Sequence, residues 1–252
     1  MTLNPTASIM VIGNEILSGR TQDVNINYIA KGLTCSGIKL IETRIIPDDQ
    51  KIIIKTVNEL RAAYDYVFST GGIGPTHDDI TSEAIAEAFG VPNPIHPEIS
   101  RLLEEHIGKE KYNDAHRKMA RFPLGATPIP NPVSVAPGYV INNVYVMAGV
   151  PQIMRAMFDQ ILPTLHHGKP IVSKSWYALH ASEGKIAHDL AHIQDQFHNL
   201  DIGSYPFYKN EDQNGIALVV KGQDQDAVQR AAQQIHQLFI RMGYDPHEGE
   251  PI

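Results

Sequence analysis

The sequence of 252 residues contains a single cysteine, no long hydrophobic run and no excess of basic residues. One cysteine excludes an intramolecular disulfide framework and a thiolate zinc cluster. No apolar run approaches the roughly 18 residues of a membrane span, and residues 1–8 lack the positive start of a secretion signal. The 21 Lys and Arg are outnumbered by 28 Asp and Glu and form no basic patch, so neither nucleic acid nor a membrane is an expected partner. We therefore expect a soluble, cytoplasmic protein.

Strand and helix patterns alternate along the first ninety residues. The strand patterns are 7–12, 39–46 and 65–70. The helix patterns are 26–33, 50–63 and 82–89. This alternation predicts an α/β fold with a mostly parallel sheet and helices on both faces. Ligands bind beyond the carboxyl ends of such strands, where we expect the loops 13–23, 47–49 and 71–81.

The chain is expected to contain two domains. The segment His166-His167-Gly168-Lys169-Pro170 has the composition of a linker. Beyond it, the patterns follow in the order βαββα over roughly 80 residues, which suffices for a small unit docked on a neighbour. We therefore predict a first domain of residues 1–168 and a small α/β domain of residues 169–252. Within the first, residues 123–137 are rich in proline and predict an irregular segment.

The strongest chemical signal is residues 69–83, STGGIGPTHDDITSE. Three glycines within four positions separate a strand from a helix. Glycine lets backbone amides approach an anion, and a helix N-terminus attracts it. We expect a phosphate site on Gly71, Gly72 and Gly74, where a side chain at Gly72 would block the anion more than the fold. The alternative is an ordinary turn in which Asp79 or Thr81 caps the helix.

Pairs of aspartates accompany two of the three loops. Asp78 and Asp79 would repel a phosphate unless a divalent cation lay between them. Asp48 and Asp49 follow the neighbouring strand and are expected at the same edge of the sheet. The two pairs together predict a site for one Mg²⁺-type ion over a diphosphate. The alternative for Asp48 and Asp49 is capping of the helix that follows them.

The loop after the first strand adds two further candidates. Asn14 is a possible hydrogen-bond donor, and Glu15 a possible metal ligand or general base; a solvated glutamate is the alternative. His188 and His192 have the i, i+4 spacing of a two-histidine metal site, but their surroundings favour an exposed helix face. Cys35, on a predicted helix, is expected to be a small core residue.

These motifs resemble one protein family. TGGIGPTHDDITSEA, residues 70–84, is similar to the signature of the MoaB/Mog molybdopterin-binding domain. IGNEILSG at residues 12–19 and PDD at 47–49 resemble its CinA-type branch, found in competence/damage-inducible proteins and related to a domain of eukaryotic FAD synthases. The similarity covers residues 7–165 and implies a three-layer MoaB/Mog-like fold. The βαββα tail suits the small domain that follows in CinA-type proteins. No counterpart of the C-terminal deamidase domain of full-length CinA is present, so that activity is not expected.

The resemblance also implies a chemistry. Two aspartates carry function in this family, and they match Asp48 and Asp79. The family uses a divalent metal (Mg, Mn or Co) to handle a phosphate, and its CinA-type and FAD synthase branches are associated with hydrolysis of ADP-ribose and of FAD. We therefore expect metal-dependent hydrolysis of a diphosphate linkage. The alternatives are a non-catalytic binder of molybdopterin or a nucleotide, and an adenylyl or molybdenum transferase. A homodimer or homotrimer is expected from the relatives.

The expected site residues form three groups. The catalytic group is Asp48, Asp79, Glu15 and His77. The phosphate-binding and substrate-binding group is Gly13, Asn14, Asn25, Gly71, Gly72, Gly74, Thr76 and Thr81. The metal group is Asp48, Asp78 and Asp79. Two motifs depart from the family: the usual DTN is Asp23-Val24-Asn25, and AGVPQIM at residues 148–154 lacks the proline and glutamate of PGVPxEM.

Overall fold

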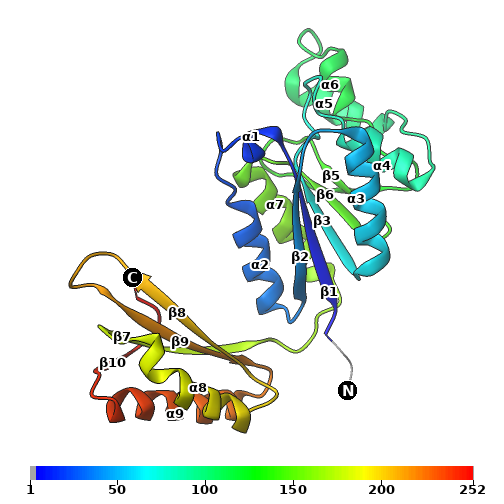
Figure 1. The fold of residues 1–252 in the computed structure, drawn as a ribbon. Helices are drawn as coiled ribbons and strands as arrows, with labels where there is room; N and C mark the ends of the chain where they lie inside the picture. Colours follow the sequence, from blue (N-terminus) through cyan, green and yellow to red (C-terminus); the bar gives the residue numbers. More distant parts are fainter. Residues whose placement is uncertain (1–3, 252) are drawn as a thin grey trace. The chain divides into compact units, whose positions relative to one another are not determined.

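The computed structural model describes residues 4–251. The chain divides into two compact units, the first ending at Gly168 and the second starting at Lys169. Each unit has its own sheet and its own hydrophobic core (Figure 1). Among the described residues, no helix is long and apolar enough to cross a lipid bilayer.

The first unit is built on a six-stranded sheet with the strand order β2-β1-β3-β6-β5-β4. Its strands are β1 (Thr6–Ile12), β2 (Lys39–Ile46), β3 (Tyr66–Thr70), β4 (Thr127–Ile129), β5 (Gly138–Ile141) and β6 (Val144–Met147). Its helices are α1 (Asn14–Leu17), α2 (Asn25–Cys35), α3 (Gln50–Ala63), α4 (Thr81–Phe89), α5 (Pro97–Ile107), α6 (Asp114–Lys118) and α7 (Pro151–Ile161). The strands β2, β1, β3 and β6 are parallel, and β5 and β4 are antiparallel to their neighbours. The prediction of a mostly parallel sheet is confirmed.

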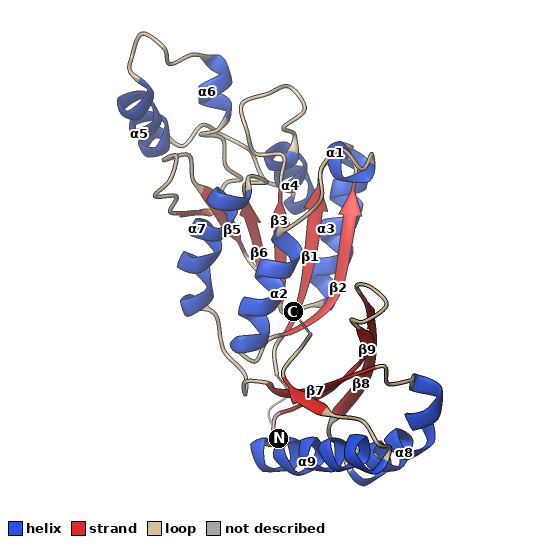
Figure 2. Ribbon diagram, turned by 90° about the vertical axis from the view of Figure 1, so that its left-hand side faces the viewer, coloured by secondary structure: helices blue, strands red, loops and turns tan. Residues whose placement is uncertain are grey.

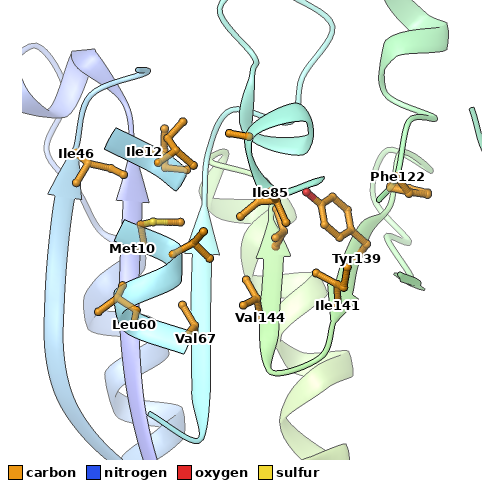
Figure 3. Close-up of a cluster of buried hydrophobic side chains, with 14 of the residues drawn as sticks. Met10, Ile12, Ile46, Leu60, Val67, Ile85, Phe122, Tyr139, Ile141 and Val144 are labelled. Carbon is orange, nitrogen blue, oxygen red and sulfur yellow. The ribbon is translucent and has the colours of Figure 1, made fainter. Parts of the chain in front are cut away.

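Helices cover both faces of this sheet (Figures 1 and 2). The strand β1, between β2 and β3, is buried on both faces, which its continuous apolar run requires. Ile9 packs with α2 and α7 on one face. Met10, the next residue, points into the opposite cluster with Leu60 of α3 and Ile85 of α4, shown in Figure 3. Three layers around two cores result, as the MoaB/Mog resemblance implies.

The second unit is a four-stranded antiparallel sheet in the order β10-β7-β9-β8, with α8 and α9 on the same face (Figures 1 and 2). Its strands are β7 (Val172–Leu179), β8 (Asp201–Tyr208), β9 (Asn214–Gly222) and β10 (Pro246–Glu248). Its helices are α8 (Glu183–Gln196) and α9 (Gln225–Arg241). The core between helices and sheet includes Leu218 of β9 and Ile235 of α9, both fully buried.

Three details of the sequence-based prediction are wrong. Cys35 is exposed rather than part of the core. The buried stripe of α2 contains Ile29 and Leu33, and a residue two positions after Leu33 is rotated by about 200° around the helix. The irregular segment 123–137 contains the short strand β4, which pairs with β5 despite Pro128. The strand β10 was not predicted, because three residues carry too little periodicity.

Candidate active site

Four loops meet at the carboxyl edge of the parallel strands and enclose a cleft of about 520 Å³. Residues from all three predicted loops line it: Gly13, Glu15, Thr21, Asp48, Gly71, Gly72, Ile73, Gly74, Pro75, Asp78 and Asp79. The fourth loop follows β6 and contributes Ala148, Gly149 and Val150. The cleft lies where a parallel sheet places its ligand, because consecutive strands all end at this edge.

The glycine loop is held against the ends of β1 and β6. Gly71 has a φ of +100°, and a Cβ there would lie 2.2 Å from the carbonyl oxygen of Ile12, so only glycine fits. The Gly71 amide donates to the carbonyl of Met147 at 3.1 Å and is therefore not free for an anion. Among the described residues, none accepts a hydrogen bond from the amides of Gly72, Ile73 and Gly74. These three amides remain available to a phosphate.

Thr81 supports the loop from beneath. Its side chain is fully buried, its amide donates to the Gly72 carbonyl at 3.0 Å, and its hydroxyl donates to the Gly71 carbonyl at 3.0 Å. A Cβ on Gly72, whose φ is +68°, would lie 2.1 Å from Thr81 Oγ1. A side chain at Gly72 would therefore disturb the fold as well as the anion site, because the buried Thr81 occupies that space.

Asp79 shapes the second half of the same loop. Its Oδ2 accepts hydrogen bonds from the Thr76 amide at 2.8 Å and from the Thr76 hydroxyl at 2.5 Å. The nearby Thr76 hydroxyl, followed by the Asp78 backbone amide, holds the pKa of Asp78 below its usual value. Asp78 is thus an ionised carboxylate at neutral pH, and both aspartates line the cleft.

The pair Asp48 and Asp49 divides into two roles. Asp49 is the N-cap of α3, where its Oδ1 accepts from the Ile52 amide at 3.0 Å. Asp48 lines the cleft, and its Oδ2 accepts from the Asn14 amide at 2.9 Å. The capping alternative therefore holds for Asp49, whereas the side chain of Asp48 lines the cleft.

Other predicted site residues lie at different depths. Glu15 lines the cleft, with its carboxylate folded back over Gly13, where a Cβ would meet Oε1 at 2.7 Å. His77 has a side chain that is 99% exposed and lies outside the cleft lining. Asn25 is buried, and its Nδ2 donates to the carbonyl of Gly149 at 2.8 Å. Asn25 therefore supports the fourth loop from below.

The acids of the cleft do not form a closed metal cage. Within residues 4–251, no three His, Cys, Asp or Glu side chains gather closely enough to hold a metal ion among themselves. The donors that Asp48, Asp78 and Asp79 offer are carboxylate oxygens, which suit Mg²⁺ or Mn²⁺. Mg²⁺ is usually bound by one or two carboxylates and completed by substrate phosphates and water. The residues fit an ion of that kind, with a phosphate as part of its ligand set.

Sequence reasoning missed two contributions to the site. Lys118, at the end of α6, donates to the carbonyl of Thr76 at 2.6 Å. Met119, Ser134 and Pro137 line the far wall of the cleft. These residues lie more than thirty positions after the glycine loop, and no motif accompanies them. Only the path of the chain between α4 and β5 brings them to this edge.

The fold and the cleft together define a three-layer α/β domain with a glycine-rich anion loop beside a cluster of acids. Residues 8–167 match the family described as the probable molybdopterin binding domain, and the chain belongs to this family. Residues 170–245 match the middle domain of FAD synthase. The MoaB/Mog-like, CinA-type resemblance is confirmed.

Individual relatives are similar over different shares of the chain. A protein of Archaeoglobus fulgidus is 35% identical over 232 residues, which is 92% of this chain and 96% of that protein. A probable FAD synthase of Caenorhabditis elegans is 31% identical over 236 residues; these cover 84% of this chain but only 46% of the synthase. The crystal structure of the protein CinA from Thermoplasma acidophilum has a TM-score of 0.61 and 32% identity, covering 65% of this chain and 99% of that one.

Proposed function

We propose that the protein hydrolyses a diphosphate linkage in an ADP-ribose-like or dinucleotide substrate, with a divalent metal ion (Mg, Mn or Co) as cofactor. The observation that carries the proposal is the meeting of unlike groups in one cleft. Unpartnered amides of the glycine loop lie beside the carboxylates of Asp48, Asp78 and Asp79. Amides attract phosphate and carboxylates repel it, so a substrate that brings its own metal ion satisfies both.

Each group has a task in the reaction. The amides of Gly72 to Gly74 bind phosphate oxygens and stabilise the charge that develops on the phosphorus under attack. Asp48 and Asp79 would hold the metal ion, which would supply Lewis-acid polarisation of the phosphoryl group and activation of the attacking water. Glu15, which lines the cleft, would accept the proton of the attacking water.

The bond changes in ADP-ribose balance as a simple hydrolysis. The water oxygen bonds to one phosphorus, and the bond from that phosphorus to the bridging oxygen breaks. The bridging oxygen leaves with the electron pair on the other phosphate. The products are AMP and ribose 5-phosphate, whichever phosphorus is attacked.

The remaining wall of the cleft suits the rest of such a substrate. Met119, Pro137, Val150 and Ile153 line it with apolar side chains. A nucleobase or a pterin is planar and apolar on its faces, so it gains from burial against such a wall. A nucleoside diphosphate therefore matches the cleft at both ends.

Two other functions remain open for the same cleft. A non-catalytic binder of molybdopterin or a nucleotide needs only the amides and the apolar wall. In this chain, Ile153 stands where the family motif PGVPxEM has glutamate, and the loss of that acid agrees with such a binder. An adenylyl or molybdenum transferase would use the same acids but deliver the phosphoryl group to an acceptor other than water. The expected homodimer or homotrimer stays a prediction.

Product analysis with isotopic water separates these functions. ADP-ribose, FAD, NAD and molybdopterin are incubated with Mg²⁺, Mn²⁺ or Co²⁺ in water enriched in ¹⁸O, and the products are measured by mass spectrometry. The hydrolase proposal predicts that ADP-ribose, FAD or NAD gives two monophosphates, one of which carries a single ¹⁸O atom, that molybdopterin, which has no diphosphate linkage, gives none, and that no product forms in the presence of EDTA. Saturable binding without products would indicate the binder. Products that need an added acceptor and contain no ¹⁸O would indicate the transferase.

A further inference from the structure

We infer that Lys118 is a positioning residue, which fixes the loop that presents Asp79 to the cleft; the inference rests on the function proposed above. Lys118 is the last residue of α6, 42 positions after Thr76, and its Nζ donates to the Thr76 carbonyl at 2.6 Å. Asp79 binds the amide and the hydroxyl of the same threonine. The Asp79 amide also donates to the Thr76 carbonyl, at 3.3 Å, so Thr76 makes three hydrogen bonds with Asp79 and one with Lys118.

The loop is a thin wall between the cleft and a second, smaller cavity. Ile73, Gly74 and Asp79 line both spaces. Lys118 lines only the smaller cavity, together with Arg121 of the following turn. This cavity has a volume of about 10 Å³, which is room for a single water molecule at most. The loop is thus packed from behind, and its position at the cleft depends on the groups that close that cavity.

Lys118 binds the Thr76 carbonyl, and this contact brings its positive charge to the loop that carries the aspartates. The ammonium group binds a carbonyl oxygen rather than forming a close pair with a carboxylate. Its positive charge therefore acts on a loop that carries both Asp78 and Asp79, and it offsets part of their negative charge. A lysine ammonium is a compact charge with three donors, so a single carbonyl contact leaves its field available to the neighbours.

No residue of the glycine loop itself could supply the positive charge that Lys118 brings to it. The loop itself contains no lysine or arginine between Ser69 and Glu83. The positively charged side chain comes instead from Lys118, in the segment between α4 and β4. Lys118 does not line the cleft, so it acts on the substrate only through the loop.

Three variants of the full chain test the inference. K118M removes the ammonium and keeps a flexible side chain, and K118R restores a donor. K111M is the matched control, since Lys111 is an exposed lysine of the same segment. The first measurement is hydrogen exchange at the Thr76 amide, which needs no substrate. Loss of one charge-assisted hydrogen bond is expected to raise the exchange rate about tenfold in K118M, with a nearly unchanged melting temperature. K118R and K111M are expected to exchange as the wild type does.

The second measurement is turnover of ADP-ribose with Mn²⁺. A displaced carboxylate in the reaction centre is expected to lower kcat about tenfold in K118M while KM stays within about twofold. K118R should recover most of the rate.

An unchanged exchange rate in K118M would overturn the inference. So would an equal rise in K111M, or a rise that K118R fails to reverse. If the wild type shows no turnover at all, the proposed hydrolase function fails, while the exchange experiment still decides the role of Lys118.

Discussion

The same hydrogen-bond motif occurs at opposite edges of the first sheet. At the amino edge, Oδ2 of Asp65 accepts from the amide and the hydroxyl of Thr6, both at 2.7 Å. At the carboxyl edge, Oδ2 of Asp79 accepts from the amide and the hydroxyl of Thr76. Asp65 joins the starts of β1 and β3, whereas Asp79 lies in the cleft beside unpartnered amides. The motif is a structural clasp at both places, and we propose a chemical task only for the one that lies in the cleft.

The largest expected effect separates the two clasps directly. Asp79→Asn removes the negative charge that holds the metal ion but keeps an oxygen for Thr76. Turnover is expected to fall about a thousandfold, equivalent to about 4 kcal/mol of lost transition-state stabilisation. Asp65→Asn is the matched control and should leave kcat/KM unchanged. Equal losses in both variants, measured with ADP-ribose and Mn²⁺, would show that the clasp acts through folding alone.

The neighbouring acids Asp48 and Asp49 sharpen the same contrast within two residues. Asp48→Asn is expected to lower turnover about a hundredfold, because one oxygen of the metal site loses its charge. Asp49→Asn keeps an N-cap acceptor, and Asp49→Ala should cost about 1 kcal/mol of stability with little change in rate. Steady-state kinetics and urea unfolding measure the two effects. If the Asp49 variants turn over slowly and Asp48→Asn turns over normally, Asp49 and not Asp48 belongs to the metal site.

A glycine pair tests how far the fold itself determines the loop. Gly72 and Gly19 have nearly the same φ, +68° and +73°, but a Cβ meets Thr81 only at Gly72. Gly19→Ala is expected to cost about 1 kcal/mol from the left-handed backbone alone. Gly72→Ala should cost about 3 kcal/mol, because Thr81 must also move and lose its hydrogen bond to Gly71. Urea unfolding gives both values, and equal costs would show that the loop yields without strain.

The smallest effect concerns acid stability. The Thr6 amide, followed by the Thr6 hydroxyl, holds the pKa of Asp65 below its usual value. A lowered folded-state pKa contributes stability above the unfolded value, about 3.9, and this contribution is lost as the pH falls through the folded value. Asp65→Asn should therefore be about 1 kcal/mol less stable at pH 7, a small value for an exposed clasp. The two proteins should converge near pH 2 in chemical unfolding. If the difference in stability between the two proteins persists at pH 2, it comes from packing and not from the charge of Asp65.

Much of the first unit could be predicted from the sequence because its signals are local. The apolar runs of β1 and β2 and the helical stripe of α3 each lie within one element, and their predicted bounds agree closely with the structure. The meeting of Asp48 with the glycine loop also followed, since parallel strands end at one edge. The sequence does not distinguish Asp48 from Asp49, because both precede a helix and only side-chain direction separates cap from cleft.

Contacts between residues far apart in the chain could not be predicted from the sequence. Lys118 meets Thr76 only because the segment after α4 returns to the sheet edge, and no periodic pattern encodes that return. The structural constraint on Gly72 could not be predicted for a similar reason. The glycine's neighbour is the buried Thr81 side chain, and the packing of that side chain beneath the loop is not visible in the spacing of residues.

The location of metal and diphosphate is the central claim, and line broadening by Mn²⁺ tests it most directly. The amide spectrum of the full chain is recorded with Mn²⁺ and an ADP-ribose analogue whose bridging oxygen is replaced by a methylene group, so that it cannot be hydrolysed. The account predicts strong broadening at Asp48, Gly72 and Gly74, and sharp signals at Thr6 and Asp65. Broadening centred on His188 and His192 of α8, or at the Thr6–Asp65 clasp, would contradict it.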